Sequence, residues 1–226
     1  MSDKLENTEI HSLSRRRAMK TSLLAGSALV SGGLLAQGRR MVPAPEEIMG
    51  PYYPVLKPLD RDADLTRIAG RHGVALGQVI ELSGRVLDGD GKPVVNAKIE
   101  LWQANVHGRY DHPSDPNTTA PLDPGFQGYS IQKTDAWGRY RFRTIKPGAY
   151  PATPEWTRTP HIHFDVSGRA DRLVTQLYFA GEPLNDSDLL FQALSEDDRR
   201  RVLVQLQPVP GTEKLAGEWD IILNNG

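Results

Sequence analysis

The segment RTPHIHFDV, residues 158–166, constrains the fold of this chain more than any other. Its two histidines, His161 and His163, are one residue apart in a stretch that otherwise has the composition of a β-strand. Alternate side chains of a strand point to the same face. One short strand therefore delivers both imidazoles to one site, while Ile162 points to an apolar layer on the other side. Paired imidazoles on a rigid strand are an economical way to hold a transition metal.

The spacing alone leaves two interpretations open. The pair binds a metal, or it consists of two partly buried histidines whose nitrogens form hydrogen bonds. The chain contains no cysteine, which excludes disulfides, thiolate catalysis and cysteine-based zinc or iron–sulfur sites. Any metal would be held by His, Tyr, Asp or Glu, a donor set that favours a hard or borderline ion.

The rest of the chain has the pattern of an all-β protein. Its 226 residues include 21 glycines and 17 prolines, which favours short strands joined by many turns over a helical bundle. We predict a β-sandwich of short mixed strands, with a tight turn at residues 88–91, a hairpin turn at 135–138 and a short helix near 195–204. The expected strands are residues 79–87, 97–104, 128–133, 139–143, 160–166, 173–179 and 219–223.

The first 38 residues differ from the remainder and are predicted to be an export signal. Residues 14–20 carry consecutive arginines, and residues 21–36 carry no charge. That apolar run is too short for a membrane span and suits a signal peptide. The arginines resemble the twin-arginine signal, which predicts periplasmic or exported protein delivered by the twin-arginine machinery. An ordinary disordered or anchoring N-terminus is the alternative. Cleavage is expected near residues 36–38, but residues 34–36 form a poor cleavage site, so retention as an anchor stays open.

Two further segments follow the signal. Residues 39–77 are rich in proline and charge without periodicity, and we expect an extended arm that wraps the core or a partner. Residues 78–226 are expected to form the β-sandwich domain. The chain has 27 basic and 28 acidic residues, a net charge of −1, so no nucleic-acid partner is expected.

Several separate motifs, in this order, resemble the intradiol ring-cleavage dioxygenases, and within that family the iron-bearing (beta) chains of the protocatechuate 3,4-dioxygenases. The resemblance covers roughly residue 50 to the C-terminus, and its fold is a transthyretin-like β-sandwich core. The motifs are GPYYP (50–54), DADLTRI (62–68), LWQANVHGRYDH (101–112), PLDPGF (121–126), DAWGRYRFRTIKPGAYP (135–151), RTPHIHF (158–164) and TQLYF (175–179).

The resemblance implies one Fe(III) per chain, bound by Tyr110, Tyr150, His161 and His163. Tyr110 and His161 would share the plane left for substrate, and Tyr150 and His163 would be the axial pair. The chemistry of these donors is suitable, because phenolate is a hard anion and a nearby cation lowers the pKa of a tyrosine below its usual value of about 10. Taken singly, Tyr110 is equally typical of a loop tyrosine covering the core, and Tyr150 of an aromatic residue at a strand end.

Four further residues are expected at the active site from the resemblance. Arg158 would stabilise the negative charge of a bound catecholate, the alternative being a surface arginine at a strand start. Gln176 would face the substrate or be a buried structural glutamine. Tyr52 and Trp102 would line the substrate pocket or belong to the core.

The implied reaction is the cleavage of a catechol-type ring by O2 between its two hydroxylated carbons, which gives a muconate-type product. The catechol would bind as a dianion while Tyr150 takes up a proton. A protocatechuate-like substrate is favoured, although the family often has Trp two residues after the Tyr150 position, where this chain has Ala152 and later Trp156. That departure leaves the choice of catechol open.

Two other questions stay open at this point. The chain would act as a homo-oligomer, or as a hetero-oligomer with a related chain. The alternative function is of a different class: the chain would be a non-catalytic binding module with a transthyretin-like β-sandwich fold. The complete set of two tyrosines and two histidines argues against that alternative. A purified protein with tyrosinate bound to iron should be visibly coloured, whereas a binding module should be colourless.

Overall fold

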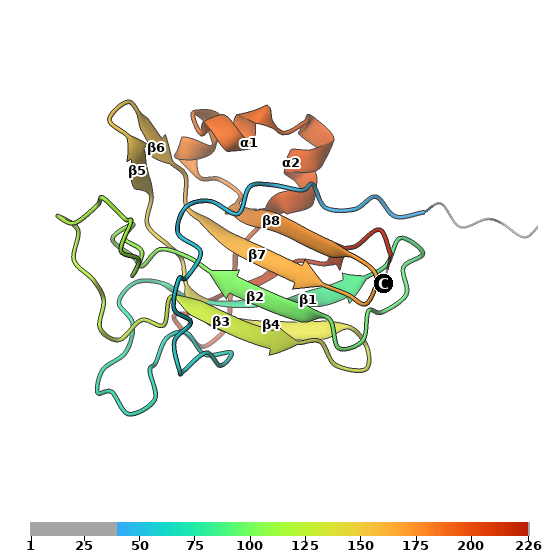
Figure 1. The fold of residues 1–226 in the computed structure, drawn as a ribbon, viewed down its shortest axis with the longest axis horizontal. Helices are drawn as coiled ribbons and strands as arrows, with labels where there is room; N and C mark the ends of the chain where they lie inside the picture. Colours follow the sequence, from blue (N-terminus) through green and yellow to red (C-terminus); the bar gives the residue numbers. More distant parts are fainter. Residues whose placement is uncertain (1–39, 226) are drawn as a thin grey trace, which may run out of the picture. The chain divides into compact units, whose positions relative to one another are not determined.

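The computed structural model describes residues 40–225, and the predicted signal segment lies outside this range. In the described residues, nearly all regular structure is β-strand, arranged as two five-stranded sheets and one separate hairpin (Figure 1). Parallel and antiparallel pairs both occur. The predicted all-β sandwich of mixed strands is therefore confirmed.

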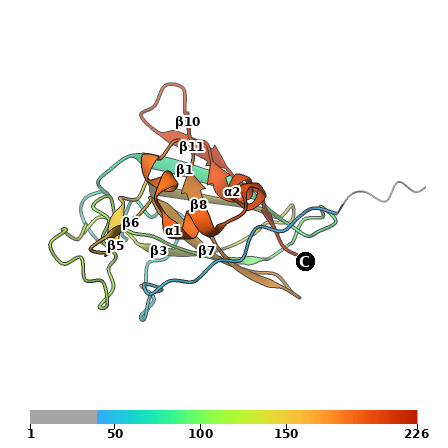
Figure 2. The same ribbon diagram turned by 90° about the horizontal axis from the view of Figure 1, so that it is seen from above.

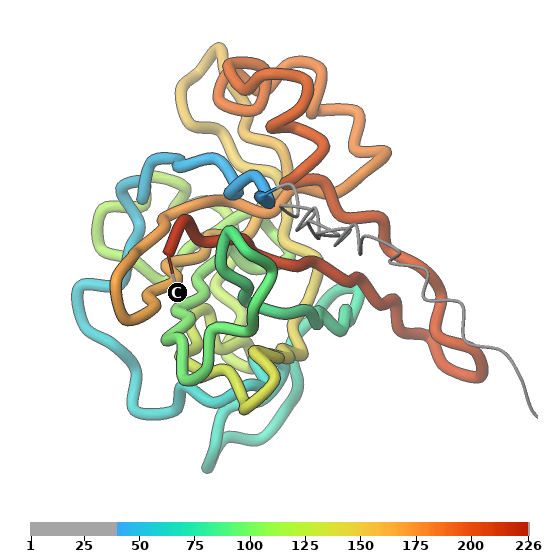
Figure 3. Tube along the Cα trace, turned by 90° about the vertical axis from the view of Figure 1, so that its right-hand side faces the viewer, coloured from blue at the N-terminus to red at the C-terminus, as the bar shows by residue number. Residues whose placement is uncertain are grey.

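The first sheet is built around the long strand β1. Strand β4 pairs with β1 in the antiparallel sense, while β11 and β12 pair with it in parallel, and β10 lies outside β11. The loop between β10 and β11 extends away from the rest of the sheet (Figures 2 and 3). The strands are β1 (Val79–Leu87), β4 (Arg139–Ile145), β10 (Gln207–Pro208), β11 (Leu215–Glu218) and β12 (Ile221–Ile222).

The second sheet has the order β3-β2-β7-β8-β9 and carries the two histidines on β7. Its pairs are antiparallel except for β8 and β9. The strands are β2 (Lys98–Trp102), β3 (Tyr129–Lys133), β7 (His161–Ser167), β8 (Arg172–Phe179) and β9 (Leu203–Val204), and the separate hairpin consists of β5 (Tyr150–Thr153) and β6 (Trp156–Arg158).

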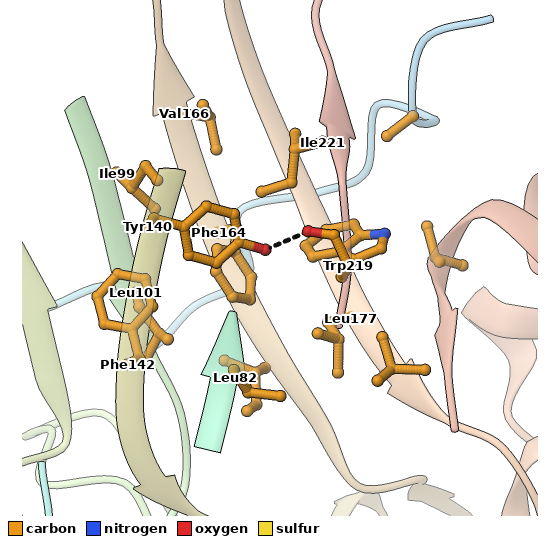
Figure 4. Packing of buried hydrophobic residues seen from close by; sticks show 14 of the residues in the cluster. Leu82, Ile99, Leu101, Tyr140, Phe142, Phe164, Val166, Leu177, Trp219 and Ile221 are labelled. Atoms are coloured by element: carbon orange, nitrogen blue, oxygen red, sulfur yellow. Dashed lines mark hydrogen bonds between the residues drawn. The ribbon is translucent and has the colours of Figure 1, made fainter. Parts of the chain in front are cut away.

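The main hydrophobic core lies between the two sheets (Figure 4). It forms because apolar residues alternate along each strand and face inward, as Ile80 and Leu82 do in β1. Phe164 contacts the rings of Phe142 and Trp219. Full burial of one such side chain contributes about 1.5–3 kcal/mol. The residues labelled in the figure are Leu82, Ile99, Leu101, Tyr140, Phe142, Phe164, Val166, Leu177, Trp219 and Ile221.

Short helices connect β8 to β9 at the edge of the second sheet (Figure 1). They are η1 (Pro183–Asp186), α1 (Leu189–Ala193) and α2 (Glu196–Val202). Ser195 caps α2 by accepting a hydrogen bond from the amide of Asp198, and acidic residues fill its first turn while arginines fill its last. This arrangement complements the helix dipole and agrees with the short helix predicted near residues 195–204.

The first part of the arm crosses the outer face of the second sheet (Figure 1, blue), whereas residues 63–65 bond to Arg143 of β4 in the first sheet and Leu65 joins the main core. Glu100 on β2 holds the first part in place, because its buried carboxylate accepts hydrogen bonds from Tyr53 and Lys57 of the arm and from Tyr129. Burial alone would raise the pKa of Glu100, but these hydrogen bonds and that from Lys98 lower it to about 2. The segment around Tyr53 and Lys57 therefore covers the sheet face opposite the main core.

Two details of the strand predictions were wrong. The tight turn at Asp135–Gly138 exists, with the Gly138 amide bonded to the Asp135 carbonyl, but it is no hairpin turn, since β3 and β4 belong to different sheets. The predicted last strand, 219–223, is reduced to Ile221–Ile222, because the Trp219 carbonyl accepts the Tyr140 hydroxyl proton instead (Figure 4). No helix among residues 40–225 has the length and apolar character to cross a membrane.

Candidate active site

Strand β7 has two chemically different faces. Ile162, Phe164 and Val166 point into the core between the sheets. His161 and His163 lie on the opposite face, under the arm, and both are buried. The alternation predicted from the sequence therefore places both imidazoles on one side of the strand.

The two histidines are held in fixed orientations. His161 donates its Nδ1 proton to the Thr159 carbonyl at 2.7 Å, which leaves the lone pair of Nε2 free. The His163 ring stacks on Trp102, with centroids 4.8 Å apart and planes 5° from parallel. Gly50 of the arm passes directly over His163: it has a positive φ of 74°, and a Cβ there would lie 3.2 Å from the imidazole.

Tyr110 reaches the site on a loop that packs closely against the chain before β5. Gly108 has a φ of 71°, and a Cβ there would lie 2.0 Å from the Ala149 carbonyl oxygen. The Gly148 amide donates to the Asn105 carbonyl, so the two segments touch backbone to backbone. This contact explains why glycine is needed in the loop and how Tyr110 comes to lie beside Tyr150.

Tyr150 begins β5 and lies directly across the hairpin from Arg158 of β6. The Tyr150 ring meets Tyr110 edge-on at 5.5 Å between centroids and lies 5.7 Å from the His161 ring. The Nε2 atoms of His161 and His163 are 3.2 Å apart. The structure thus brings together all four residues that the sequence predicted as metal ligands, and all four are buried.

Burial sets the protonation of these four groups. It lowers the pKa of His163 to about 3 and that of His161 well below 6.5, so both imidazoles are neutral and offer a lone pair. Burial raises the pKa of Tyr150 to about 12, against the lowering effect of the Arg158 charge. Burial and the neighbouring Tyr150 raise the pKa of Tyr110 well above 10. Without a nearby cation, both phenols therefore keep their protons.

The donors fit a metal ion. Within residues 40–225, the Tyr110 hydroxyl is buried without a hydrogen-bond partner, and a buried polar group in this state needs an explanation. Two nitrogens bound at right angles to one metal lie roughly 3 Å apart, close to the observed separation. In the described part of the chain no three His, Cys, Asp or Glu side chains gather at one point, so only the tyrosines complete this donor set.

Arg158 lies beside the four candidate ligands and is almost fully buried, which excludes the surface-arginine alternative. Its Nε donates to Asp188 at 2.8 Å, and its Nη2 donates to the Gln176 side-chain oxygen at 2.7 Å. The Gln176 amide nitrogen donates in turn to the Ile48 carbonyl of the arm. The guanidinium therefore has a fixed position, and Gln176 is fully buried with both ends of its amide engaged.

Three residues of this network were not predicted as site residues: Asp188, Glu47 and Tyr178. Asp188 pairs with Arg158 and also caps α1, accepting from the amides of Leu190 and Phe191. Glu47 of the arm accepts the Tyr178 hydroxyl proton at 2.7 Å and the Gln176 backbone amide at 3.1 Å. An acidic residue before an apolar run is a signal for Asp188 as a helix cap. No local pattern indicates Glu47, because its partners are far away in the sequence.

Tyr52 and Trp102, the two predicted pocket residues, line a cavity of about 680 Å3 beside the candidate ligands. The Tyr52 ring is 4.7 Å from Tyr110 and 5.8 Å from Tyr150 between centroids. Of the four candidate ligands, only Tyr110 lines this cavity. The cavity therefore lies beside the cluster of candidate ligands, and Arg158 does not line it.

Comparisons with known proteins agree with this arrangement. A family model described as Dioxygenase matches residues 48–225. The beta chain of protocatechuate 3,4-dioxygenase from Burkholderia cepacia is 46% identical over 196 residues, which cover 82% of this chain and 82% of that relative. Catechol 1,2-dioxygenase from Acinetobacter baylyi is 36% identical over 132 residues, which cover 51% of this chain but only 40% of that relative.

Solved structures show the same fold. The dioxygenase domain of a dioxygenase and carbohydrate-binding protein fusion from Streptomyces sp. SirexAA-E matches with a TM-score of 0.63 at 29% identity, covering 82% of this chain and all of that domain. Catechol 1,2-dioxygenase from Pseudomonas arvilla C-1 matches with a TM-score of 0.62 at 27% identity, covering 81% of this chain and 63% of that one.

The chain belongs to the intradiol ring-cleavage dioxygenase family. It is accordingly an oxidoreductase of this class and not a non-catalytic binding module.

Proposed function

We propose that this chain is a non-haem Fe(III) intradiol dioxygenase with one iron per chain, bound by Tyr110, Tyr150, His161 and His163. It would cleave a protocatechuate-like catechol with O2 between the two hydroxylated carbons and give a muconate-type product. The observation that carries the proposal is the buried meeting of two neutral imidazoles, with Nε2 atoms 3.2 Å apart, and two phenols. Among the described residues, the Tyr110 hydroxyl has no hydrogen-bond partner.

Iron(III), when bound, supplies Lewis-acid charge that favours the phenolate forms of the tyrosines and the dianion of the catechol. The protein's part follows from the residues around it. Tyr150 Oη is suited to take up a catechol proton. The pKa of Tyr150 is about 12 without metal, so its phenolate form is a strong base. Arg158 lies across the hairpin from Tyr150 and places a fixed positive charge where the ring becomes electron-rich.

The substrate proposal is supported by the relative from Burkholderia cepacia, which is named for protocatechuate. That relative is also named a beta chain, which supports assembly with a companion chain over a homo-oligomer. The twin-arginine pattern at residues 14–20 supports export of the folded, iron-loaded protein to the periplasm, with cleavage or retention of the signal left to experiment.

Oxygen uptake by the purified, iron-loaded chain tests the proposed reaction. Catechol, protocatechuate and hydroxyquinol are offered separately, and the product is identified by mass spectrometry. The proposal predicts consumption of one O2 per ring and a muconate-type acid in which the two new carboxylates contain both atoms of O2. A product cleaved outside the two hydroxylated carbons would contradict it. If no substrate is turned over without a companion chain, the assay is repeated with protein co-purified from its native source.

Substitution of a single ligand tests the metal site separately. Tyr110→Phe removes one anionic donor and should lower the iron content and bleach the visible absorption. Tyr52→Phe is the matched control, since the Tyr52 ring touches Tyr110 but is not a proposed ligand. Equal iron in both variants would exclude Tyr110 from the metal site.

A further inference from the structure

Glu47 connects the arm to the edge of strand β8. Strand β9 pairs with β8 from Tyr178 onward, and Glu47 bonds to the part of the edge that precedes it, where the arm runs beside β8 (Figure 1). The Glu47 backbone amide donates to the Val174 carbonyl at 2.8 Å. Its carboxylate accepts hydrogen bonds from the Gln176 amide at 3.1 Å and from the Tyr178 hydroxyl at 2.7 Å. Glu47 therefore docks the arm on β8 with both its backbone and its side chain.

The two β8 residues that bond to the Glu47 carboxylate also hold the Arg158 guanidinium. Arg158 Nη2 donates to Gln176 Oε1 at 2.7 Å and lies 3.4 Å from the Tyr178 hydroxyl oxygen. A tyrosine hydroxyl has a single proton to donate. Because Tyr178 donates this proton to Glu47, its oxygen faces the guanidinium as an acceptor, and Gln176 Oε1 stays free for Arg158. The ionised Glu47 thus sets the direction of the hydrogen bonds that end at Arg158.

These hydrogen bonds lead to the centre of the site. Tyr178 lies directly opposite His161 in the pairing of β8 with β7, and the two rings are 6.0 Å apart between centroids. Arg158 lies directly opposite Tyr150 in the hairpin β5–β6. A fixed charge stabilises a developing negative charge only from the right place, and a displacement of about 1 Å can reduce a rate by roughly a hundredfold. A residue that holds the guanidinium in place therefore affects the rate without touching the substrate.

The Glu47 carboxylate lowers the stability of the folded protein when it is ionised. Burial raises the pKa of Glu47 from 4.5 to about 7, although the hydrogen bonds from Tyr178 and Gln176 and the charge of Arg158 act in the opposite direction. The charge of Asp188 adds to the increase in pKa. Because the folded state holds the proton more tightly than the unfolded state, ionisation above pH 7 reduces stability. A group kept in a partly buried place at such a cost is typical of a functional site.

We propose that Glu47 is a positioning residue for the dioxygenase reaction, which holds the Arg158 guanidinium in its working place through Tyr178 and Gln176. This inference rests on the proposed function, because it assumes that Arg158 stabilises the electron-rich catechol ring. The hydrogen bonds of Glu47 go to β8 and not to the candidate ligands. Docking of the arm on β8 and the placement of the charge beside Tyr150 are therefore coupled, and iron binding is independent of Glu47.

Glu47→Gln in the iron-loaded chain is the first test. The variant keeps the size of the side chain but replaces one acceptor oxygen by an NH2 donor. The Tyr178 hydroxyl then turns to Gln176 Oε1, 3.2 Å away, and competes there with Arg158. We expect kcat for protocatechuate to fall by about tenfold, less than the roughly hundredfold effect of a lost contact, while iron content and the visible absorption stay unchanged. Glu46→Gln, at the exposed neighbouring position, is the matched control and should keep the wild-type rate. An unchanged kcat in Glu47→Gln would overturn the proposal.

A double-mutant cycle shows whether Glu47 acts through Arg158. In an Arg158→Ala background, Glu47→Gln should cause no further fall in kcat, because the guanidinium that Glu47 positions is gone. The effects of independent sites multiply in rate, so a second fall of about tenfold in the double variant would contradict the proposed coupling.

The pH profile gives a further readout. The kcat of the wild type should fall as the pH drops through about 7, where Glu47 takes up a proton and loses acceptor capacity. This step should be missing from the profile of Glu47→Gln. A step of equal size in both proteins would overturn the proposal.

Stability separates a positioning role from a structural one. At pH 8, Glu47→Gln should resist urea at least as well as the wild type, because the partly buried charge is gone. Loss of stability or of iron together with the rate would make Glu47 a structural residue and overturn the proposal. If the wild type cleaves no catechol in any preparation, the proposed function itself fails. If the wild type is active and Glu47→Gln is equally active, this inference fails alone.

Discussion

The Arg158→Ala variant separates catalysis from metal binding. Arg158 is not a proposed ligand, yet its guanidinium is buried beside Tyr150 and held by Asp188 and Gln176. If its charge stabilises the electron-rich ring, the variant should keep its iron and its colour but lose turnover. Loss of one such preorganised contact typically costs about a hundredfold in kcat.

The same variant also has a cost in stability that can be estimated from the structure. Removing one partner of a buried ion pair destabilises a protein by about 3–5 kcal/mol. Asp188 keeps three backbone donors, the amides of Thr159, Leu190 and Phe191, so we expect the lower end, roughly 3 kcal/mol. Urea denaturation measures this loss, and kinetics are measured at a temperature where the variant stays folded.

Two comparisons make the Arg158 test decisive. Arg158→Lys should restore turnover only in part, because an ammonium cannot bond Asp188 and Gln176 with the planar geometry of a guanidinium. Arg169→Ala, at an exposed position, should change neither stability nor rate. Normal turnover in Arg158→Ala would refute the electrostatic role. Loss of iron in that variant would instead make Arg158 a residue that orders the strand carrying the histidines.

Three other predictions concern stability and export. Burial raises the pKa of Glu47 from 4.5 to about 7, so the folded state binds the extra proton and stability falls as the pH rises from 4.5 through 7, by at most roughly 3 kcal/mol. Urea denaturation at pH 5 and pH 8 should show a smaller fall in Glu47→Gln than in Glu46→Gln, and an equal fall would contradict the burial argument. Phe164→Ala should lower the unfolding free energy by about 3–5 kcal/mol, and a loss below 1 kcal/mol would show that the core rearranges freely. Arg15→Lys combined with Arg16→Lys should retain the protein in the cytoplasm, which cell fractionation detects, and an unchanged periplasmic yield would argue against the twin-arginine route.

The parts of the fold that follow local periodicity were predictable from the sequence. The alternation in residues 158–166 fixes which side of β7 carries His161 and His163, because that alternation depends only on strand geometry. Strands β1, β2, β7 and β8 were located for the same reason. The hairpin β5–β6 was missed, since its short strands contain Pro151 and no clear alternation.

The rest of the site depends on contacts between segments that are far apart in the chain. Glu47 and Gln176 meet only because the arm crosses β8 in one particular register, and no local pattern specifies that register. The cavity is likewise formed by the arm, the loop around Arg109 and the segment before β3. The meeting of the four candidate ligands was predictable from motif resemblance. The network that holds Arg158 and the residues of the pocket wall were not predictable in this way.

Metal analysis of the purified chain, expressed with iron, tests the central claim most directly. Two phenols and two imidazoles buried together should retain one ferric ion per chain, and tyrosinate bound to it should give a visible absorption band. Stoichiometric iron with this colour is the predicted result. A colourless protein that contains zinc, or no metal, would contradict the account.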